Sequence, residues 1–261
     1  MTNGRRGGSV KSFGAGRIAL WHGGIVWIGH AGEETGFHSH HAIQVTLSLS
    51  GGALYFKIPG EDWQAHAAAV IAAHQPHAFD GRGGLVALIL IEPESREGRA
   101  LRQRYPAGVA SLAPDALAVA AAELSAAWAA GTGNEELAAR ARAVTTMLTS
   151  MQAMPPGPLD RRIARAIEVL RQRIGETVTL SEVADAVHLS SERFRHLFLQ
   201  ETGIRFRPYV LWLRIEVALA AYAAGKSLTE AAYAGGFADS AHFSRTFKRM
   251  FGVPAVSVGR I

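Results

Sequence analysis

Histidine is the residue type whose spacing in this sequence points most directly to chemistry. Eight of the eleven histidines precede residue 80, and two of them form His38-Ser39-His40. Alternate side chains of an extended strand point to the same side, so we expect His38 and His40 to share one face of a strand. Gln44 follows four residues later, and Pro76-His77 brings another imidazole. Imidazole nitrogens are common ligands of divalent transition metals, whereas an amide is a weak substitute for a carboxylate.

Cysteine chemistry is absent, because the 261-residue chain contains no cysteine. This excludes disulfides, thiolate zinc sites and a cysteine nucleophile, and it fits a reducing compartment. The sequence has no run of about 18 apolar residues that would predict a membrane span. Arg5 and Arg6 are not followed by the apolar stretch of a secretory signal. We therefore expect a cytoplasmic protein without membrane contact.

Basic side chains form the second chemically informative group. The formal net charge is +5, but residues 1–158 hold 12 basic and 12 acidic side chains, whereas residues 159–261 hold 15 and 10. The change falls at the proline-rich stretch 154–158, which cannot continue a helix and is typical of a semi-rigid linker. This asymmetry predicts two domains and favours nucleic acid as a partner of the second. A solvated basic face is the alternative explanation.

The basic half contains an internal repeat. Thr179-Leu180-Ser181-Glu182 is a capping box at the start of a helix, and Ser227-Leu228-Thr229-Glu230 repeats it 48 residues later. Each box is followed by a tight turn and by a residue suited to cap a second helix: Val187–Leu189 and Ser190 in the first copy, Gly235–Phe237 and Asp239 in the second. The sequence therefore predicts two helix-turn-helix units.

A single helix is expected to join the two units. Pro208 suits a helix start, and residues 209–224 contain no helix breaker before Gly225. Such a helix spans about 25 Å, and successive major-groove faces of B-DNA lie about 34 Å apart. Allowing for the width of the helices, this connection would hold two recognition helices one groove turn apart.

A further set of motifs extends through both copies. The second copy contains Gly236-Phe237, His242-Phe243-Ser244-Arg245, Phe247-Lys248, Phe251-Gly252 and Pro254, and the first contains Phe198 to Gly203. Through these motifs, residues 160–254 resemble the AraC/XylS family of bacterial transcription regulators. The ending departs from the family pattern, because Ala255-Val256-Ser257-Val258 replaces a serine, an aromatic residue and an arginine. The resemblance implies binding to double-stranded DNA, RNA polymerase as a partner, a small-molecule effector and a homodimer.

In such modules the first turns of each second helix face the base edges. The side chains expected there are Glu192, Arg195 and His196 in the first unit, and Ser240, Ala241, Ser244 and Arg245 in the second. Arginine can pair bidentately with guanine and glutamate can accept from cytosine. Arg195 could instead contact a phosphate, and Glu192 could simply favour the helix start. Arg193, Lys248 and Arg249 are expected to contact phosphates.

The neutral half has the pattern of a β fold. Short apolar runs with Gly-rich turns predict strands at 25–28, 42–49, 53–58, 69–71 and 85–91, with a hairpin turn at Gly51-Gly52. Several short strands favour a barrel or double-sheet fold. The sequence His38-x-His40-x-x-x-Gln44, then Gly51, then Pro76-His77 resembles the cupin pattern, with Gln44 in place of its glutamate.

The cupin resemblance leaves three interpretations of these side chains. His38, His40, Gln44 and His77 would hold a divalent transition metal, or would line an effector pocket, or would only hydrogen-bond at the barrel mouth. The remaining early histidines have no ligand spacing and are expected to be exposed or satisfied locally: His22, His30, His41, His66 and His74.

Apolar residues at helical spacing predict a helical hairpin after the strands. One seam contains Leu117, Ala121, Leu124 and Trp128, and the other contains Leu137, Ala141, Val144, Leu148 and Met151. These seams would either pack on the barrel or form a dimer contact.

The predicted fold class is multidomain α+β. Its parts are a flexible tail (1–16), a cupin-like β-barrel sensor domain (17–95), a helical hairpin or dimerisation segment (96–153), a Pro-rich linker (154–159) and an AraC-type DNA-binding domain with two helix-turn-helix motifs (160–261). The leading hypothesis is an effector-responsive transcription regulator without enzymatic activity. The alternatives are a metal-dependent cupin enzyme fused to a DNA-binding module, and a regulator whose barrel is purely structural.

Overall fold

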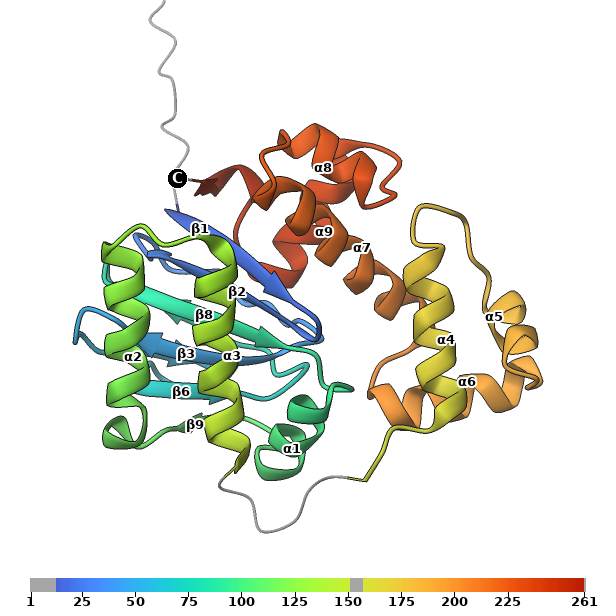
Figure 1. The fold of residues 1–261 in the computed structure, drawn as a ribbon, viewed down its shortest axis with the longest axis horizontal. Helices are drawn as coiled ribbons and strands as arrows, with labels where there is room; N and C mark the ends of the chain where they lie inside the picture. Colours follow the sequence, from blue (N-terminus) through green and yellow to red (C-terminus); the bar gives the residue numbers. More distant parts are fainter. Residues whose placement is uncertain (1–12, 151–156, 261) are drawn as a thin grey trace, which may run out of the picture.

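The computed structural model describes residues 13–150 and 157–260 (Figure 1). Two β-sheets form the first part of the chain. A seven-stranded sheet has the order β10-β1-β2-β8-β3-β6-β9, and a three-stranded sheet has the order β5-β4-β7. The strands are β1 Gly14–Trp21, β2 Gly24–His30, β3 Ile43–Ser48, β4 Leu54–Lys57, β5 Gln64–His66, β6 Ala68–Ile71, β7 Ala78–Asp80, β8 Leu85–Ile91, β9 Val109–Ser111 and β10 Val258–Arg260.

The central strands bury both of their faces. In β2, Ile25 and Trp27 belong to one hydrophobic core, whereas Val26 and Ile28 belong to another. This is the alternation that the period of two along a strand imposes. The first core also contains Leu54, Phe56 and Phe79 of the three-stranded sheet. The two sheets therefore pack together, as predicted for a double-sheet β fold.

Helices cover the other face of the large sheet. They are α1 Arg96–Arg104, α2 Pro114–Ala129 and α3 Asn134–Ser150 (Figure 1). The predicted seams, including Leu117, Leu124, Leu137 and Leu148, are buried in the core beneath this face. These side chains are therefore not available to a second copy of the chain. The segment also contains β9, which pairs with β6, while Met151 lies outside the described residues.

Three local predictions were wrong. The prediction of a flexible tail over residues 1–16 was wrong for residues 13–16, because Phe13 is buried and β1 starts at Gly14. Gly51-Gly52 does not close a hairpin, because β3 and β4 belong to different sheets. His38 and His40 do not lie on a named strand; they lie in an extended segment, in which His38 forms an isolated bridge with His77.

The second part of the chain is helical. Its helices are α4 Arg161–Gln172, α5 Leu180–Ala186, α6 Ser191–Thr202, α7 Phe206–Ala223, α8 Leu228–Ala234 and α9 Ser240–Phe251. Both predicted capping boxes are present at the starts of α5 and α8. Ser190 and Asp239 cap α6 and α9, and Gly203 and Gly252 end these helices in the left-handed conformation. The duplicated helix-turn-helix is thus confirmed.

The repeat has a glycine in only one of its two turns. Gly236 adopts a φ of 71° in the second unit, and His188 adopts a φ of 56° at the matching place in the first. A left-handed conformation costs a residue with a Cβ atom about 1–2 kcal/mol. The first turn is therefore the more strained of the two.

The β region (residues 13–150) and the helical region (residues 157–257) are joined by backbone pairing. Strand β10 follows the last helical turn and pairs in parallel with β1, so that Gly14 faces Val258 (Figure 1). The amide of Gly36 also donates to the carbonyl oxygen of Gly252 at 3.1 Å. Among the described residues, no helix is long and apolar enough to span a membrane.

Candidate functional site: recognition helices and an imidazole cluster

The predicted base-facing side chains of α6 lie on its exposed surface. Glu192, Arg193, Arg195 and His196 are all exposed, while Phe194 and Phe198 between them are buried in the helical core. Ser190 holds the start of α6 by accepting from the amide of Arg193. A capped helix with a polar first turn has the form needed for entry into a major groove.

Helix α9 repeats this arrangement. Ser240, Ala241, Arg245, Lys248 and Arg249 are exposed and Ser244 is half-buried. Phe243, Phe247 and Met250 are buried on the opposite side. In both units, the predicted DNA contacts are therefore separate from the residues that build the core. Within residues 13–150 and 157–260, neither Arg195 nor Arg245 forms an ion pair.

Helix α7 joins the two units without interruption. Its 18 residues correspond to about 27 Å at the rise of an α-helix. Tyr209, Trp212 and Ile215 are almost completely buried along it. The connection between the recognition helices is therefore a rigid element that also forms the core.

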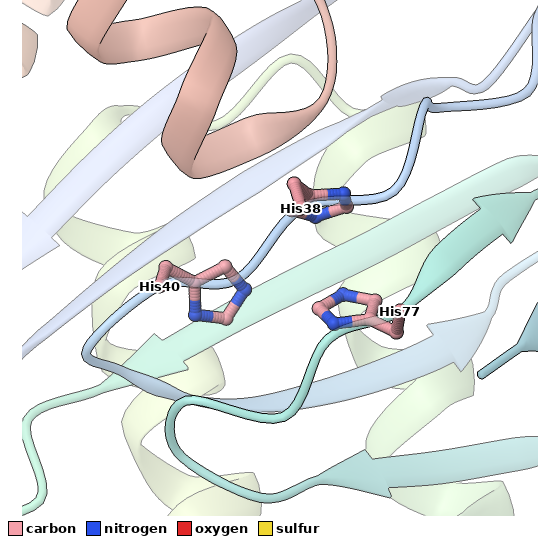
Figure 2. A group of neighbouring side chains, drawn as sticks. All are labelled: His38, His40 and His77. Atoms are coloured by element: carbon pink, nitrogen blue, oxygen red, sulfur yellow. The ribbon is translucent and has the colours of Figure 1, made fainter. Parts of the chain in front are cut away.

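Three histidines of the β region come together in a buried cluster (Figure 2). His38 and His40 lie on one segment and His77 on another, and one ring nitrogen from each lies within 4.8 Å of the others. The ring centroids of His38 and His77 are 4.2 Å apart. The two segments are held in register by backbone hydrogen bonds between His38 and His77 in both directions, at 3.0 and 2.9 Å.

Backbone carbonyls orient all three rings in the same way. Nδ1 of His38 lies 2.8 Å from the carbonyl oxygen of Gly36, and Nδ1 of His77 lies 2.8 Å from that of Gln75. Nδ1 of His40 lies 2.9 Å from the carbonyl oxygen of Ala42. A neutral ring that donates from Nδ1 keeps a lone pair on Nε2, which is the arrangement of metal-binding histidines.

Burial keeps the three rings neutral. Desolvation lowers the pKa of His38 to about 4 and, together with the charge of His38, that of His40 to about 3. The pKa of His77 also lies well below its usual value, first because of desolvation. Neutral imidazole is the form that binds a metal. Nε2 of His77 is buried with no hydrogen-bond partner, so these residues fit a divalent transition metal.

Gln44 lies beside the three histidines, in contact with His40. Its Oε1 lies 3.0 Å from Nε2 of His40, and its Nε2 donates to the hydroxyl of Thr46 at 2.9 Å. Both ring nitrogens of His40 face oxygen atoms, and a neutral ring can donate to only one of them. Metal binding at Nε2 would have to displace Oε1 of Gln44. The prediction brought His38, His40 and His77 together correctly, with Gln44 beside His40.

A largely apolar cavity lies next to the cluster. It has about 660 Å³ of space free of protein atoms, its opening included. Its walls come from the β region, including Trp27 and Phe79, and from the helical region, including Phe247 and Phe251; Thr35, His38 and Gln44 supply its polar atoms. The effector-pocket interpretation expected a pocket within the β-barrel. The cavity is instead lined by both the β region and the helical region.

A second buried polar network went unnoticed in the sequence. Nε2 of His41 lies 2.8 Å from Oε2 of Glu94, and Nδ1 of His41 lies 3.3 Å from Nε2 of His74. The hydroxyl of Tyr209 on α7 donates to Oε1 of Glu94. Burial alone would raise the pKa of Glu94, but His41 and these hydrogen bonds lower it overall. The expectation that His41 is exposed or satisfied locally was thus wrong.

A network of charged and polar side chains continues the same seam between the regions. Arg171 of α4 forms an ion pair with Glu92, which follows β8, and donates a hydrogen bond to Oε2 of Glu216 of α7 at 3.2 Å. Burial and the charge of Glu92 raise the pKa of Glu216 well above its usual value. The sequence signal for this network is the Glu92-Pro93-Glu94 triplet after an apolar strand. It does not identify the partners, because Arg171 lies 79 positions from Glu92 and Tyr209 lies 115 positions from Glu94.

Comparison with known proteins gives a consistent result for the helical region. Residues 183–258 match the family model of a helix-turn-helix domain. A 96-residue stretch is 33% identical to the uncharacterised helix-turn-helix-type transcriptional regulator YidL of Escherichia coli K12, covering 36% of this chain and 32% of YidL. A 94-residue stretch is 34% identical to the transcriptional activator RhaS of Escherichia fergusonii, covering 36% of this chain and 34% of RhaS.

The similarity to these curated relatives spans about a third of their length. The fold as a whole resembles that of ToxT from Vibrio cholerae strain SCE256, solved with an unsaturated fatty acid bound. The TM-score is 0.56 at 12% identity, over 88% of this chain and 92% of ToxT. Both of these curated relatives are transcription regulators. Residues 183–258, which contain most of the duplicated helix-turn-helix, are therefore a helix-turn-helix domain similar to those of transcription regulators.

Proposed function

We propose that this protein is a sequence-specific DNA-binding transcription regulator that contacts two successive major-groove segments. The observation that carries the proposal is the pair of capped helices with exposed polar first turns, α6 and α9, joined by the continuous helix α7. The connecting helix is about 27 Å long, which suits a separation of one turn of B-DNA once the width of the helices is included.

The exposed side chains divide into two roles. Arg195 and Arg245 lie in the second turns of α6 and α9, on their exposed sides, and are proposed to pair with guanine. Glu192, His196, Ser240, Ala241 and Ser244 would contact neighbouring base edges. Arg193, Lys248 and Arg249 would contact phosphates, which set affinity and salt dependence rather than sequence choice.

The β region is proposed to bind a small ligand that adjusts the helical region. The cavity supports this role because both regions line it, and a ligand there would bind two arrangements of the regions differently. Its walls favour a largely apolar molecule with one polar group near Thr35, His38 and Gln44. The fatty acid seen in ToxT is a ligand of this general kind.

A metal at the imidazole cluster would be held by one ring nitrogen each of His38, His40 and His77. Because each Nδ1 already faces a backbone carbonyl, that nitrogen would be Nε2. It would supply a fixed positive charge and a coordination position for a polar group. The protein's own residues contribute the orientation of the rings through Gly36, Ala42 and Gln75 and the exclusion of water around them.

The test is selection of bound sites from random double-stranded DNA, followed by binding measurements on single-base variants of the selected site. We expect two half-sites about one helical turn apart. Arg245→Ala should cost about 1–3 kcal/mol and relax specificity at one position in one half-site, and Arg195→Ala should do so in the other. Equal weakening on all sequences would make either arginine a phosphate contact, and a lack of selected sites would refute the proposed function.

A further inference from the structure

The loop that orients one histidine of the cluster also holds the end of a recognition helix. Gly36 accepts from the ring of His38 through its carbonyl oxygen, at 2.8 Å. Its amide donates to the carbonyl oxygen of Gly252, the residue that ends α9, at 3.1 Å. One peptide unit on each side of Gly36 therefore links the imidazole of His38 to the last turn of α9.

Aromatic contacts connect the cluster to the helical region a second time. The ring of Phe251, the last residue of α9, lies 6.0 Å from that of His40. Trp212 of α7 lies 6.5 Å from the same ring. The cluster is thus in contact with the recognition helix of the second unit and with the helix that joins both units.

The packing at Gly252 leaves no room for a side chain. A methyl group there would overlap the carbonyl oxygen of Gly36 and would lie 2.7 Å from Nδ1 of His38. The close approach therefore couples the positions of these two segments, because a shift of His38 toward a ligand cannot leave Gly252 unaffected.

We propose that a divalent transition-metal ion, bound by His38, His40 and His77, is itself a controlling ligand of this protein and acts on α9 through Gly36 and Gly252. This inference rests on the proposed function, since it assigns a signal to the same regulator. It differs from a merely structural metal because it requires that metal occupancy changes DNA affinity.

The physical basis is the close packing of these segments. A metal on Nε2 of His38 would make its Nδ1–H a stronger donor to the carbonyl oxygen of Gly36. This carbonyl and the Gly36 amide belong to different peptide groups, so the effect would reach Gly252 through the position of Gly36, which is packed tightly against it. Metal binding also has to free Nε2 of His40 from Gln44, which moves the ring that lies against Phe251.

The first experiment uses the full chain stripped of metal and titrated with Zn²⁺ and Co²⁺. Calorimetry gives the stoichiometry, and the visible spectrum of Co²⁺ reports imidazole ligation. We expect one ion per chain, and we expect the affinity for the selected DNA site to differ at least about fivefold between the metal-free and metal-bound chain. DNA must then change the metal affinity by the same factor.

Two pairs of variants separate the site from its coupling. His77→Gln should abolish metal binding, whereas His66→Gln should not, although Nε2 of both histidines is buried without a partner. Gly252→Ala, whose methyl group would displace the Gly36 carbonyl and His38, should change the factor by which metal alters DNA affinity, and an unchanged factor contradicts the coupling. Gly203→Ala is the matched control, because it ends α6 with a φ of 75° and its nearest contact for a methyl group is 3.6 Å away.

The outcomes distinguish this inference from the proposed function. If the ion binds and DNA affinity is unchanged, the inference fails and the regulator stands. If no ion binds, it fails as well. If no DNA is bound in either state, the proposed function fails, and hydrogen exchange then tests the coupling between the metal and α9. Metal should slow exchange of the Gly36 amide at least about fivefold, and unchanged exchange overturns the coupling.

Discussion

The hydroxyl of Tyr209 donates a hydrogen bond to Oε1 of Glu94 over 2.5 Å, and this bond joins α7 to the end of the large sheet. Both side chains are buried. Tyr209→Phe removes the donor and leaves a buried carboxylate with one partner fewer. Since hydrogen bonds to charged groups contribute about 1.5–3 kcal/mol, we expect the free energy of unfolding to fall by that amount in urea denaturation of the full chain.

Tyr233→Phe provides the control for this change. Tyr233 lies on α8 with 61% of its surface exposed, so the same loss of a hydroxyl should alter the free energy of unfolding by no more than about 0.5 kcal/mol. Equal effects of the two substitutions would mean that the bond between Tyr209 and Glu94 does not stabilise the contact between the regions.

Glu216 gives the protein a stability that depends on pH. Its pKa is raised well above the usual value of 4.5, chiefly by burial. Above about pH 4.5 the unfolded chain releases a proton that the folded chain retains, so stability falls as pH rises until the folded pKa is passed. Glu216→Gln removes this proton. Its stability relative to the parent chain should increase with pH, by up to about 1.4 kcal/mol per unit.

Thermal unfolding of both chains between pH 5 and pH 8 measures this difference. Glu168→Gln on α4 is the control, because Glu168 is exposed and its described partners, Arg165 and Gln172, lie one helical turn away on the same surface helix. Its difference from the parent chain should stay within about 0.5 kcal/mol throughout. A flat profile for Glu216→Gln would show that Glu216 is ionised in the folded protein and paired with Arg171.

Lys248 should affect the salt dependence of DNA binding rather than its sequence preference. It is exposed in the last turns of α9. Lys248→Ala should weaken binding to all sequences similarly and reduce the slope of log K against log salt by about 1. Lys57→Ala in β4 of the β region is the control and should leave the slope unchanged. A loss of affinity at one base position only would assign Lys248 to base contact instead.

The two turns of the repeat should respond oppositely to exchange of their residues. His188→Gly relieves a side chain at a φ of 56°, and we expect the free energy of unfolding to rise by roughly 0.5–1 kcal/mol. Gly236→Ala forces a side chain into a φ of 71°, 2.8 Å from the carbonyl oxygen of Ile174, and should cost more than about 2 kcal/mol. Urea denaturation tests both, and a destabilised His188→Gly would indicate that the imidazole has a role of its own.

The helix-turn-helix repeat was predictable because its signals are local. Thr179 and Glu182 are three residues apart, and their reciprocal hydrogen bonds form within one turn. The same holds for Ser227 and Glu230. Likewise, the pairing of His38 with His40 followed from their spacing in an extended segment, although His77 entered the cluster only through resemblance to a known pattern.

The seam between the regions could not be predicted in this way. Glu94 meets His41 from 53 positions away and Tyr209 from 115, and no periodicity links such residues. The three-residue strands β5 and β7 are too short to show an alternation. The cavity needs walls from both regions, so it exists only once the chain has folded back on itself.

The pairing of β10 with β1 also bears on how the protein is made. Gly14 and Val258 face each other but are separated by 244 positions, that is 258 minus 14. A chain that emerges from the ribosome folds its first part before its last. Until β10 is synthesised, β1 is therefore an open edge of the large sheet that can pair with other chains. We expect dependence on chaperones to be greatest in this interval, and to fall when β10 covers this edge of β1.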